Sequence, residues 1–296
     1  MDISEYGAAE NVDSLIQEFG KYGLFKHAVE LEAYGMTVVP AEEMRSSPGF
    51  IERLREAILR TCEKRNGIEI GDHQTAAPSP ADVGKNSWDL LEEDEVFVEA
   101  ATNPVLLALV RWLLGQSAVF GGQTWIIKGQ DAGGINLHSD SHGIPPGAGQ
   151  IAHMCNASWV CTDYEGAEDG PTVFVPGSHK YGRATLPHET DLETTAFKTF
   201  PLIAKAGSLA IWNGATWHAS VPRTKPGLRV TLVQTFMRTY MRPIHMYDRD
   251  TSPQLLQKYP ELERVIGKPL YPYEDPQRPE RSRIAPFKLT GTDPYA

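Results

Sequence analysis

The chain has 296 residues, of which 41% are hydrophobic and 22% charged, so its composition is that of a globular protein rather than a disordered chain or a coiled coil. Its formal net charge of -10 at pH 7 argues against a nucleic-acid-binding scaffold, because no basic stripe is available to displace counterions from phosphates. The three cysteines, Cys62, Cys155 and Cys161, have no disulfide-framework spacing, so we interpret them as small core residues in a reducing compartment.

The first 115 residues are predicted to be mostly helical. Apolar residues recur at helical spacing in three segments, 12–32, 48–64 and 96–114. We expect Ser47 to cap the second helix, with Pro48 at its first position. Tyr34–Pro40 has the pattern of a short strand closed by proline. Residues 66–93 show no sustained periodicity and predict a long loop.

Nothing in the sequence indicates a membrane partner. The N-terminus lacks the basic segment and apolar run of a secretory signal. The most apolar segment, Val105–Leu114, is short and contains Arg111, so it cannot span a bilayer. We therefore expect a cytoplasmic protein.

After Gly115 the pattern changes from helical to β. Strands separated by Gly, Pro, Asp or Asn are predicted at 118–120, 123–128, 151–162, 171–176, 206–212 and 229–237. Many short strands with turns between them indicate a sandwich, jelly roll or barrel. Prolines recur after Arg238, with one helical piece near 252–266, which we interpret as an irregular wrap. The prediction is one domain over 1–296, with a helical support (1–115), a β core (116–238) and a C-terminal wrap (239–296).

A His-x-Asp pair lies in this β half. Alternate side chains of a strand point the same way, so His138 and Asp140 would project together. A second imidazole from His218 would complete the two-histidine, one-carboxylate set of non-haem Fe(II) oxygenases. His142 shares the same face, but Gly143 indicates that the strand is ending, so we place His142 in the substrate pocket or on its rim.

A candidate anion anchor follows His218. Ser220 lies two residues on and shares its strand face. If the Pro- and Gly-containing segment after it forms a hairpin, Ser220 faces Arg229, and His218 faces Thr231. A guanidinium beside a metal-binding imidazole could hold a carboxylate through charge-assisted hydrogen bonds. A dicarboxylate that chelates iron at one end needs such an anchor at the other.

These residues together resemble the phytanoyl-CoA dioxygenase family of Fe(II)- and 2-oxoglutarate-dependent oxygenases. The resemblance covers about residues 34–237 and includes Gly-Pro-Thr-Val-Phe-Val-Pro-Gly-Ser-His at 170–179, in which Pro-Gly-Ser-His at 176–179 is the most distinctive piece. It implies a mainly β fold with a double-stranded β-helix core, a jelly-roll or cupin-like arrangement supported by N-terminal α-helices. It also implies Fe(II), the cosubstrate 2-oxoglutarate and O2, with release of succinate and CO2.

The resemblance implies roles for individual residues. The implied iron ligands are His138, Asp140 and His218. The positions implied to hold or surround 2-oxoglutarate are Arg229, Ser220, Thr172, Gln123 and Trp159, with Arg229 on the distal carboxylate. His179 is implied to be a turn residue rather than a ligand. Similar halogenases replace the carboxylate ligand by a small residue, so Asp140 favours hydroxylation, desaturation or epoxidation.

Two other functions are open at this point: a non-catalytic β-barrel that binds a metal or small ligand, and a zinc-dependent hydrolase, since two histidines and a carboxylate also suit catalytic zinc. The additional Arg229 and Ser220 favour the oxygenase. We expect a small metabolite or natural-product intermediate as substrate, because no basic cluster for a CoA phosphate is evident. The sequence does not specify an oligomeric state. The candidate specificity elements are 66–93, 141–150 and the tail after 238, with Trp88, His142, Tyr240 and Tyr247 as candidate pocket residues.

Overall fold

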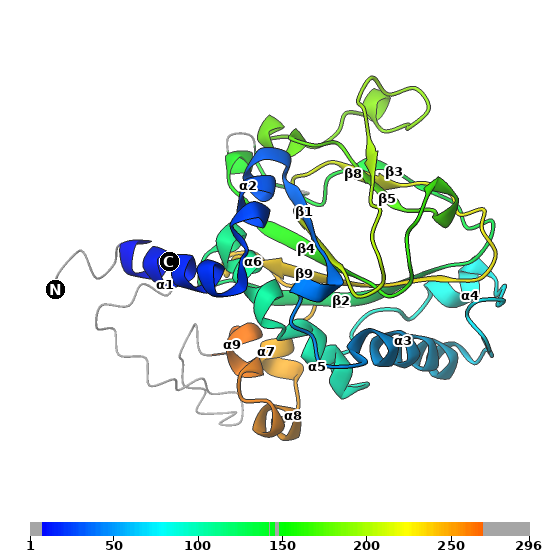
Figure 1. The fold of residues 1–296 in the computed structure, drawn as a ribbon, viewed down its shortest axis with the longest axis horizontal. Helices are drawn as coiled ribbons and strands as arrows, with labels where there is room; N and C mark the ends of the chain where they lie inside the picture. Colours follow the sequence, from blue (N-terminus) through cyan, green and yellow to red (C-terminus); the bar gives the residue numbers. More distant parts are fainter. Residues whose placement is uncertain (1–7, 142, 146–147, 269–296) are drawn as a thin grey trace.

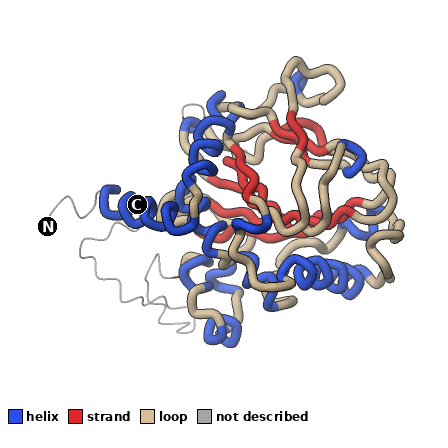
Figure 2. Tube along the Cα trace, viewed as in Figure 1, coloured by secondary structure: helices blue, strands red, loops and turns tan. Residues whose placement is uncertain are grey.

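The computed structural model describes residues 8–141, 143–145 and 148–268. Within these residues two antiparallel sheets face each other, and helices cover the outer face of the larger sheet (Figure 1). Figure 2 shows the strands of both sheets enclosing the space between them. This arrangement confirms the predicted mainly β, jelly-roll class of fold.

The larger sheet has the strand order β1-β7-β4-β9-β2. Its strands are β1 (Met36–Val39), β2 (Val119–Lys128), β4 (Met154–Val160), β7 (Leu209–Asn213) and β9 (Arg229–Met237). The smaller sheet has the order β3-β8-β5-β6. Its strands are β3 (Ile135–His138), β5 (Thr172–Phe174), β6 (Phe200–Pro201) and β8 (His218–Ser220).

Helices precede and follow the β core. Before β2, the described residues form the helices α1 (Ala8–Tyr22), α2 (Phe25–Tyr34), α3 (Phe50–Asn66), α4 (Pro80–Gly84), α5 (Glu95–Ala101) and α6 (Pro104–Leu114), with β1 between α2 and α3. After β9 come the short helices α7 (Tyr247–Asp250), α8 (Pro253–Lys258) and α9 (Leu262–Val265). Helices α3, α5 and α7–α9 lie below the larger sheet in Figure 1, on the side away from β3, β5 and β8.

Strand β9 places side chains alternately on the two faces of the larger sheet. Val230, Leu232 and Phe236 point towards the helices and belong to the main hydrophobic core. The alternate residues, Arg229 and Thr231 among them, point towards the smaller sheet and line the cavity between the sheets. Because successive side chains of a strand point to opposite faces, a single strand separates core from cavity.

Two predicted helices are each divided in two. The segment 12–32 breaks between α1 and α2 at Gly23, whose φ of 76° lies in the left-handed region that glycine adopts at no steric cost. The segment 96–114 breaks at Asn103, whose side-chain oxygen accepts hydrogen bonds from Val105 N (3.0 Å) and Leu106 N (3.1 Å). Pro104 then occupies the first turn of α6.

The predicted cap of the second helix is wrong. Helix α3 begins at Phe50, and Gly49 in the left-handed conformation precedes it, so neither Ser47 nor Pro48 occupies the predicted position. Residues 66–93 form the predicted irregular segment, interrupted by α4 and by a β-bridge from Trp88 to strand β2. In the C-terminal wrap, residues 269–296 lie outside the described part of the chain.

In the part of the chain that the structure describes, no single helix is long and apolar enough to cross a membrane. Helices α5 and α6 meet that test only together, as a pair bent by 45°, and most of their side chains are buried in the core. Cys62, Cys155 and Cys161 are free and buried, which agrees with their interpretation as core residues.

Candidate metal centre

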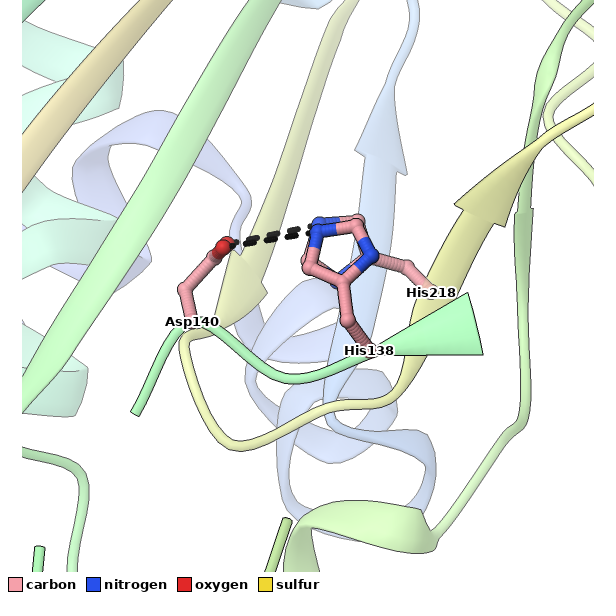
Figure 3. A group of neighbouring side chains, drawn as sticks. All are labelled: His138, Asp140 and His218. Atoms are coloured by element: carbon pink, nitrogen blue, oxygen red, sulfur yellow. Dashed lines mark ion pairs between the residues drawn. The ribbon is translucent and has the colours of Figure 1, made fainter. Parts of the chain in front are cut away.

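Three metal-binding side chains meet at the junction of β3 and β8 (Figure 3). His138 ends β3, and His218 begins β8 as its direct partner in the antiparallel pairing. Asp140 follows β3 in the adjoining turn and points at both imidazoles. One ligand atom from each residue lies within 4.8 Å of the other two. No other cluster of this kind occurs among the described residues.

The hydrogen bonds of the two rings orient them for metal binding. His138 Nδ1 lies 2.8 Å from Asn136 O, and His218 Nδ1 lies 3.0 Å from Thr216 O. A carbonyl oxygen can only accept, so each Nδ1 donates and each Nε2 keeps its lone pair in the neutral ring. The two Nε2 atoms lie 3.6 Å and 3.3 Å from the oxygens of Asp140. This donor set suits a divalent metal, and carbonyl partners of this kind fix the tautomer of histidine ligands.

Burial strengthens this assignment for His218. Removal from solvent lowers the pKa of its ring, and the neighbouring Asp140 only partly offsets that effect. The ring is therefore neutral, as a metal ligand must be.

A hydrogen-bonded chain that we did not predict holds the carboxylate of Asp140. Asn156 Nδ2, on β4, donates to Asp140 Oδ2 at 2.5 Å. Thr235 Oγ1, on the neighbouring strand β9, donates to Asn156 Oδ1 at 2.7 Å, so the amide must turn its NH2 towards Asp140. The sequence signal for this chain is an amide residue, Asn156, inside a strand that is otherwise apolar except for Ser158.

Two cationic side chains lie beside the cluster without a carboxylate partner. Arg229 is 2% exposed, donates to Gly170 O and stacks over the ring of Tyr164, with its guanidinium 5.2 Å from the ring centre. Its Nε has no hydrogen-bond partner among the described residues. Lys128, the cross-strand partner of Arg229, donates from Nζ to Ser220 Oγ at 2.9 Å.

These two cations form a candidate anion site. Burial, and then the charge of Arg229, lower the pKa of Lys128 to about 7. Burying charges without counter-ions is costly, so the pair is stabilised by a ligand that brings negative charge. The free Nε of Arg229 offers that ligand a donor that no described residue uses. Sequence reasoning found Arg229 and missed Lys128, because their pairing joins strands far apart in the chain.

A cavity of about 550 Å³ lies between the sheets. Its lining includes the three candidate metal ligands and the two cations of the candidate anion site. The predicted site residues that line it are His138, Asp140, His218, Ser220, Arg229 and Thr172. Trp88 also lines it, as expected of a candidate pocket residue. His179 lies in a short 3₁₀ turn and is not part of the metal cluster, in keeping with its implied role.

The predicted hairpin between β8 and β9 is wrong. Strand β8 lies in the smaller sheet, between β3 and β5, whereas β9 lies in the larger sheet, between β4 and β2. Ser220 therefore pairs with Ile135 and Thr172 instead of Arg229, and the other predicted cross-strand pair does not form either. Ser220 and Arg229 still line one cavity because the two sheets face each other, with Lys128 bridging from one sheet to the other.

Gln123 and Trp159 also need correction. Both are fully buried on the helix side of the larger sheet and do not line the cavity. Gln123 Nε2 donates to Phe97 O of α5 at 3.3 Å, and Trp159 packs edge-on against Phe50 of α3. The cavity side of β2 and β4 carries the even-numbered residues, so the odd-numbered pair points away.

Two other candidate pocket residues lie elsewhere. Tyr240 is exposed and hydrogen-bonds through its hydroxyl to His153 Nδ1 at 2.9 Å. Tyr247 is buried in the core against Phe120. His142 lies outside the described residues.

The chain matches one family model and several solved structures. The model of the family described as phytanoyl-CoA dioxygenase matches residues 31–231. No curated protein matches the chain. HygX from Streptomyces hygroscopicus, solved with nickel and 2-oxoglutarate bound, has 19% sequence identity and a TM-score of 0.55, over 75% of this chain and 90% of that one.

Two further solved structures have a similar fold. EctD from S. alaskensis with bound iron has 18% identity and a TM-score of 0.57, over 74% of this chain and 79% of that one. The α-ketoglutarate-dependent epimerase SnoN from nogalamycin biosynthesis has 20% identity and a TM-score of 0.51, over 73% and 81%. At such identities the likeness shows the shared fold.

Proposed function

The chain belongs to the phytanoyl-CoA dioxygenase family and is a non-haem iron, 2-oxoglutarate-dependent enzyme; within that class we propose that it hydroxylates a small organic molecule. One observation carries the proposal. The convergent cluster of His138, Asp140 and His218 shares its cavity with the buried Arg229, whose Nε lacks a partner among the described residues.

In this proposal His138, Asp140 and His218 hold the iron. Iron held there would activate O2, which is the oxidant: one oxygen atom enters the substrate as hydroxyl and the other enters succinate, as 2-oxoglutarate loses CO2. The protein positions the reactants and excludes water. The carbonyl oxygens of Asn136 and Thr216 contribute by accepting hydrogen bonds from the Nδ1–H groups, which leaves the Nε2 lone pairs for the metal.

Arg229, Lys128 and Ser220 would anchor the distal carboxylate of 2-oxoglutarate. A guanidinium presents several donors to a carboxylate, and Arg229 lines the cavity and has an Nε that no described residue uses. An arriving carboxylate also favours the charged form of Lys128, whose amine sits against Ser220. Thr172 is the partner of Ser220 on the neighbouring strand and lines the same cavity.

The anion site favours this function over a zinc hydrolase and over a non-catalytic binding protein. Neither of those needs two buried cations a short way from the metal, whereas a chelating dicarboxylate cosubstrate does. The presence of Asp140 as a carboxylate ligand supports hydroxylation, desaturation or epoxidation in preference to halogenation. The cavity volume of about 550 Å³ fits a small-molecule substrate.

Anaerobic titration tests the proposed site directly. Adding Fe(II) and then 2-oxoglutarate should produce the weak visible charge-transfer band of an iron-chelated keto acid. Asp140→Ala should lose the band, while Asp250→Ala, an exposed acid on α7 outside the cavity, should keep it. Absence of the band in the unmodified protein would contradict the proposal.

A further inference from the structure

The outer part of the cavity is apolar. Three large hydrophobic side chains on its lining are strongly exposed, Trp88 (42%), Ile135 (51%) and Ile244 (51%). They come from the loop before α5, from β3 and from the segment after β9. Exposed apolar side chains scattered singly are ordinary, but three on one cavity mark a surface that a ligand covers.

The charges on the same lining are uneven. Asp140 is the single carboxylate among the described residues that line the cavity, and it faces the two histidines. The basic side chains on the lining are Lys128 and Arg229 in the anion site, and Arg242 near the apolar residues. A cationic substrate would therefore meet no free counter-charge on this lining.

Arg242 has no polar partner among the described residues. It is exposed, and its guanidinium makes no hydrogen bond or ion pair with any described residue. The preceding arginine, Arg238, is different, because it donates from Nε to Ala152 O at 2.7 Å and has a structural role. Arg242 thus offers its donors to whatever enters the cavity.

The cosubstrate does not satisfy Arg242. In the proposed function, the charges of iron and Arg229 are balanced by Asp140 and the two carboxylates of 2-oxoglutarate. Lys128, which donates to Ser220 Oγ, adds one positive charge beyond this balance in its protonated form. Once iron and cosubstrate are bound, no carboxylate of the described lining is left to pair with Arg242.

We propose that the substrate is an apolar molecule that carries one carboxylate, with its hydrocarbon body against Trp88, Ile135 and Ile244 and its carboxylate on Arg242. This inference rests on the proposed function, because the charge balance includes iron and 2-oxoglutarate. The same surface selects against amines, which find no free acid there. It also selects against CoA thioesters, whose several phosphates would share one arginine.

Binding of matched probes tests this substrate class. The protein is loaded with Zn(II), in place of the redox-active iron, and with 2-oxoglutarate, and calorimetry then measures its affinity for decanoate, 1-decanol, decylamine and decanoyl-CoA. Decanoate should bind about fivefold more tightly than decanol, since an exposed ion pair contributes up to about that much, and decylamine should bind least tightly. Decanoyl-CoA should bind no more tightly than decanoate, and the advantage of decanoate should shrink at high salt.

Variants separate the two parts of the surface. Arg242→Gln should remove the advantage of decanoate over decanol, whereas Arg249→Gln, an exposed arginine on α7 outside the cavity, should not. Ile244→Gln should weaken decanoate and decanol alike. The inference is overturned if decylamine or the CoA thioester binds better than decanoate, if Arg242→Gln weakens all probes equally, or if decanoate shows no saturable binding.

The same titrations distinguish this failure from failure of the proposed function. Binding of Zn(II) and of 2-oxoglutarate is measured first, in separate steps. If 2-oxoglutarate does not bind, the proposed function fails. If 2-oxoglutarate binds and the preference for the carboxylate is absent, only the substrate class fails.

Discussion

Replacing Asn156 by Leu removes the donor that holds the carboxylate of Asp140. The bond between them, 2.5 Å long, has a charged acceptor, and such bonds contribute about 1.5–3 kcal/mol. Thr235 would also lose its acceptor, because its hydroxyl donates to Asn156 Oδ1. We expect the affinity for divalent metal to fall about 10- to 100-fold, the range typical of residues that orient a metal ligand.

Titration with Co(II), followed by its visible absorption, measures that affinity without requiring turnover. Ser158→Ala is the matched control, because Ser158 lies two residues along the same strand face, lines the same cavity and does not contact Asp140. Thermal unfolding of both variants establishes that they fold. Equal affinity in Asn156→Leu and the unmodified protein, or an equal loss in Ser158→Ala, would refute the positioning role of Asn156.

Three further predictions concern the anion site and the core. Arg229→Ala should raise the Kd for 2-oxoglutarate at least about 30-fold and change the metal affinity little. The reason is that truncating one partner of a buried charge pair costs about 2–5 kcal/mol. An unchanged Kd would exclude Arg229 as the anchor. The pKa of Lys128 lies at about 7, and its charged form favours an anion, so affinity for 2-oxoglutarate should be full below that pH and fall as pH rises through it. Lys128→Met should flatten this pH profile, and a slope that persists would assign it to another group. Trp159→Phe should lower the melting temperature and leave the Kd values for metal and 2-oxoglutarate unchanged, because Trp159 packs against Phe50 in the core. A shift in either Kd would show that Trp159 does contribute to the site.

Local patterns were sufficient to predict the metal cluster. His138 and Asp140 are close in sequence, and the turn after β3 preserves their common direction. His218 was found because it follows an apolar strand, β7, and precedes a serine and an arginine. The resemblance to a known family united these short signals over about residues 34–237, and the family model confirms it over 31–231.

Long-range strand pairing could not be predicted in the same way. A short Pro- and Gly-containing segment usually joins two strands of one sheet, but here it carries the chain from β8 in the smaller sheet to β9 in the larger one. The pairing of β9 with β2 and β4 joins strands that lie far from it in the sequence, so no local pattern indicates it. For that reason the contacts of Lys128 and Asn156 were missed, since both depend on partners in distant strands.

The errors at Gln123 and Trp159 have a simpler cause. The strands that carry them were predicted, but a shift of one residue moves a side chain from the cavity to the core. Both faces of the larger sheet are buried, so hydrophobicity did not distinguish the face towards the helices from the face towards the cavity.

The most direct test of the central claim is the conversion of 2-oxoglutarate to succinate in air. With Fe(II) present, the unmodified protein should form succinate, and Asp140→Ala, which lacks the carboxylate ligand, should form none under the same conditions. Omitting Fe(II) should also stop the reaction. No succinate from the unmodified protein, or an equal yield from Asp140→Ala, would contradict the assignment of this cluster as the iron site.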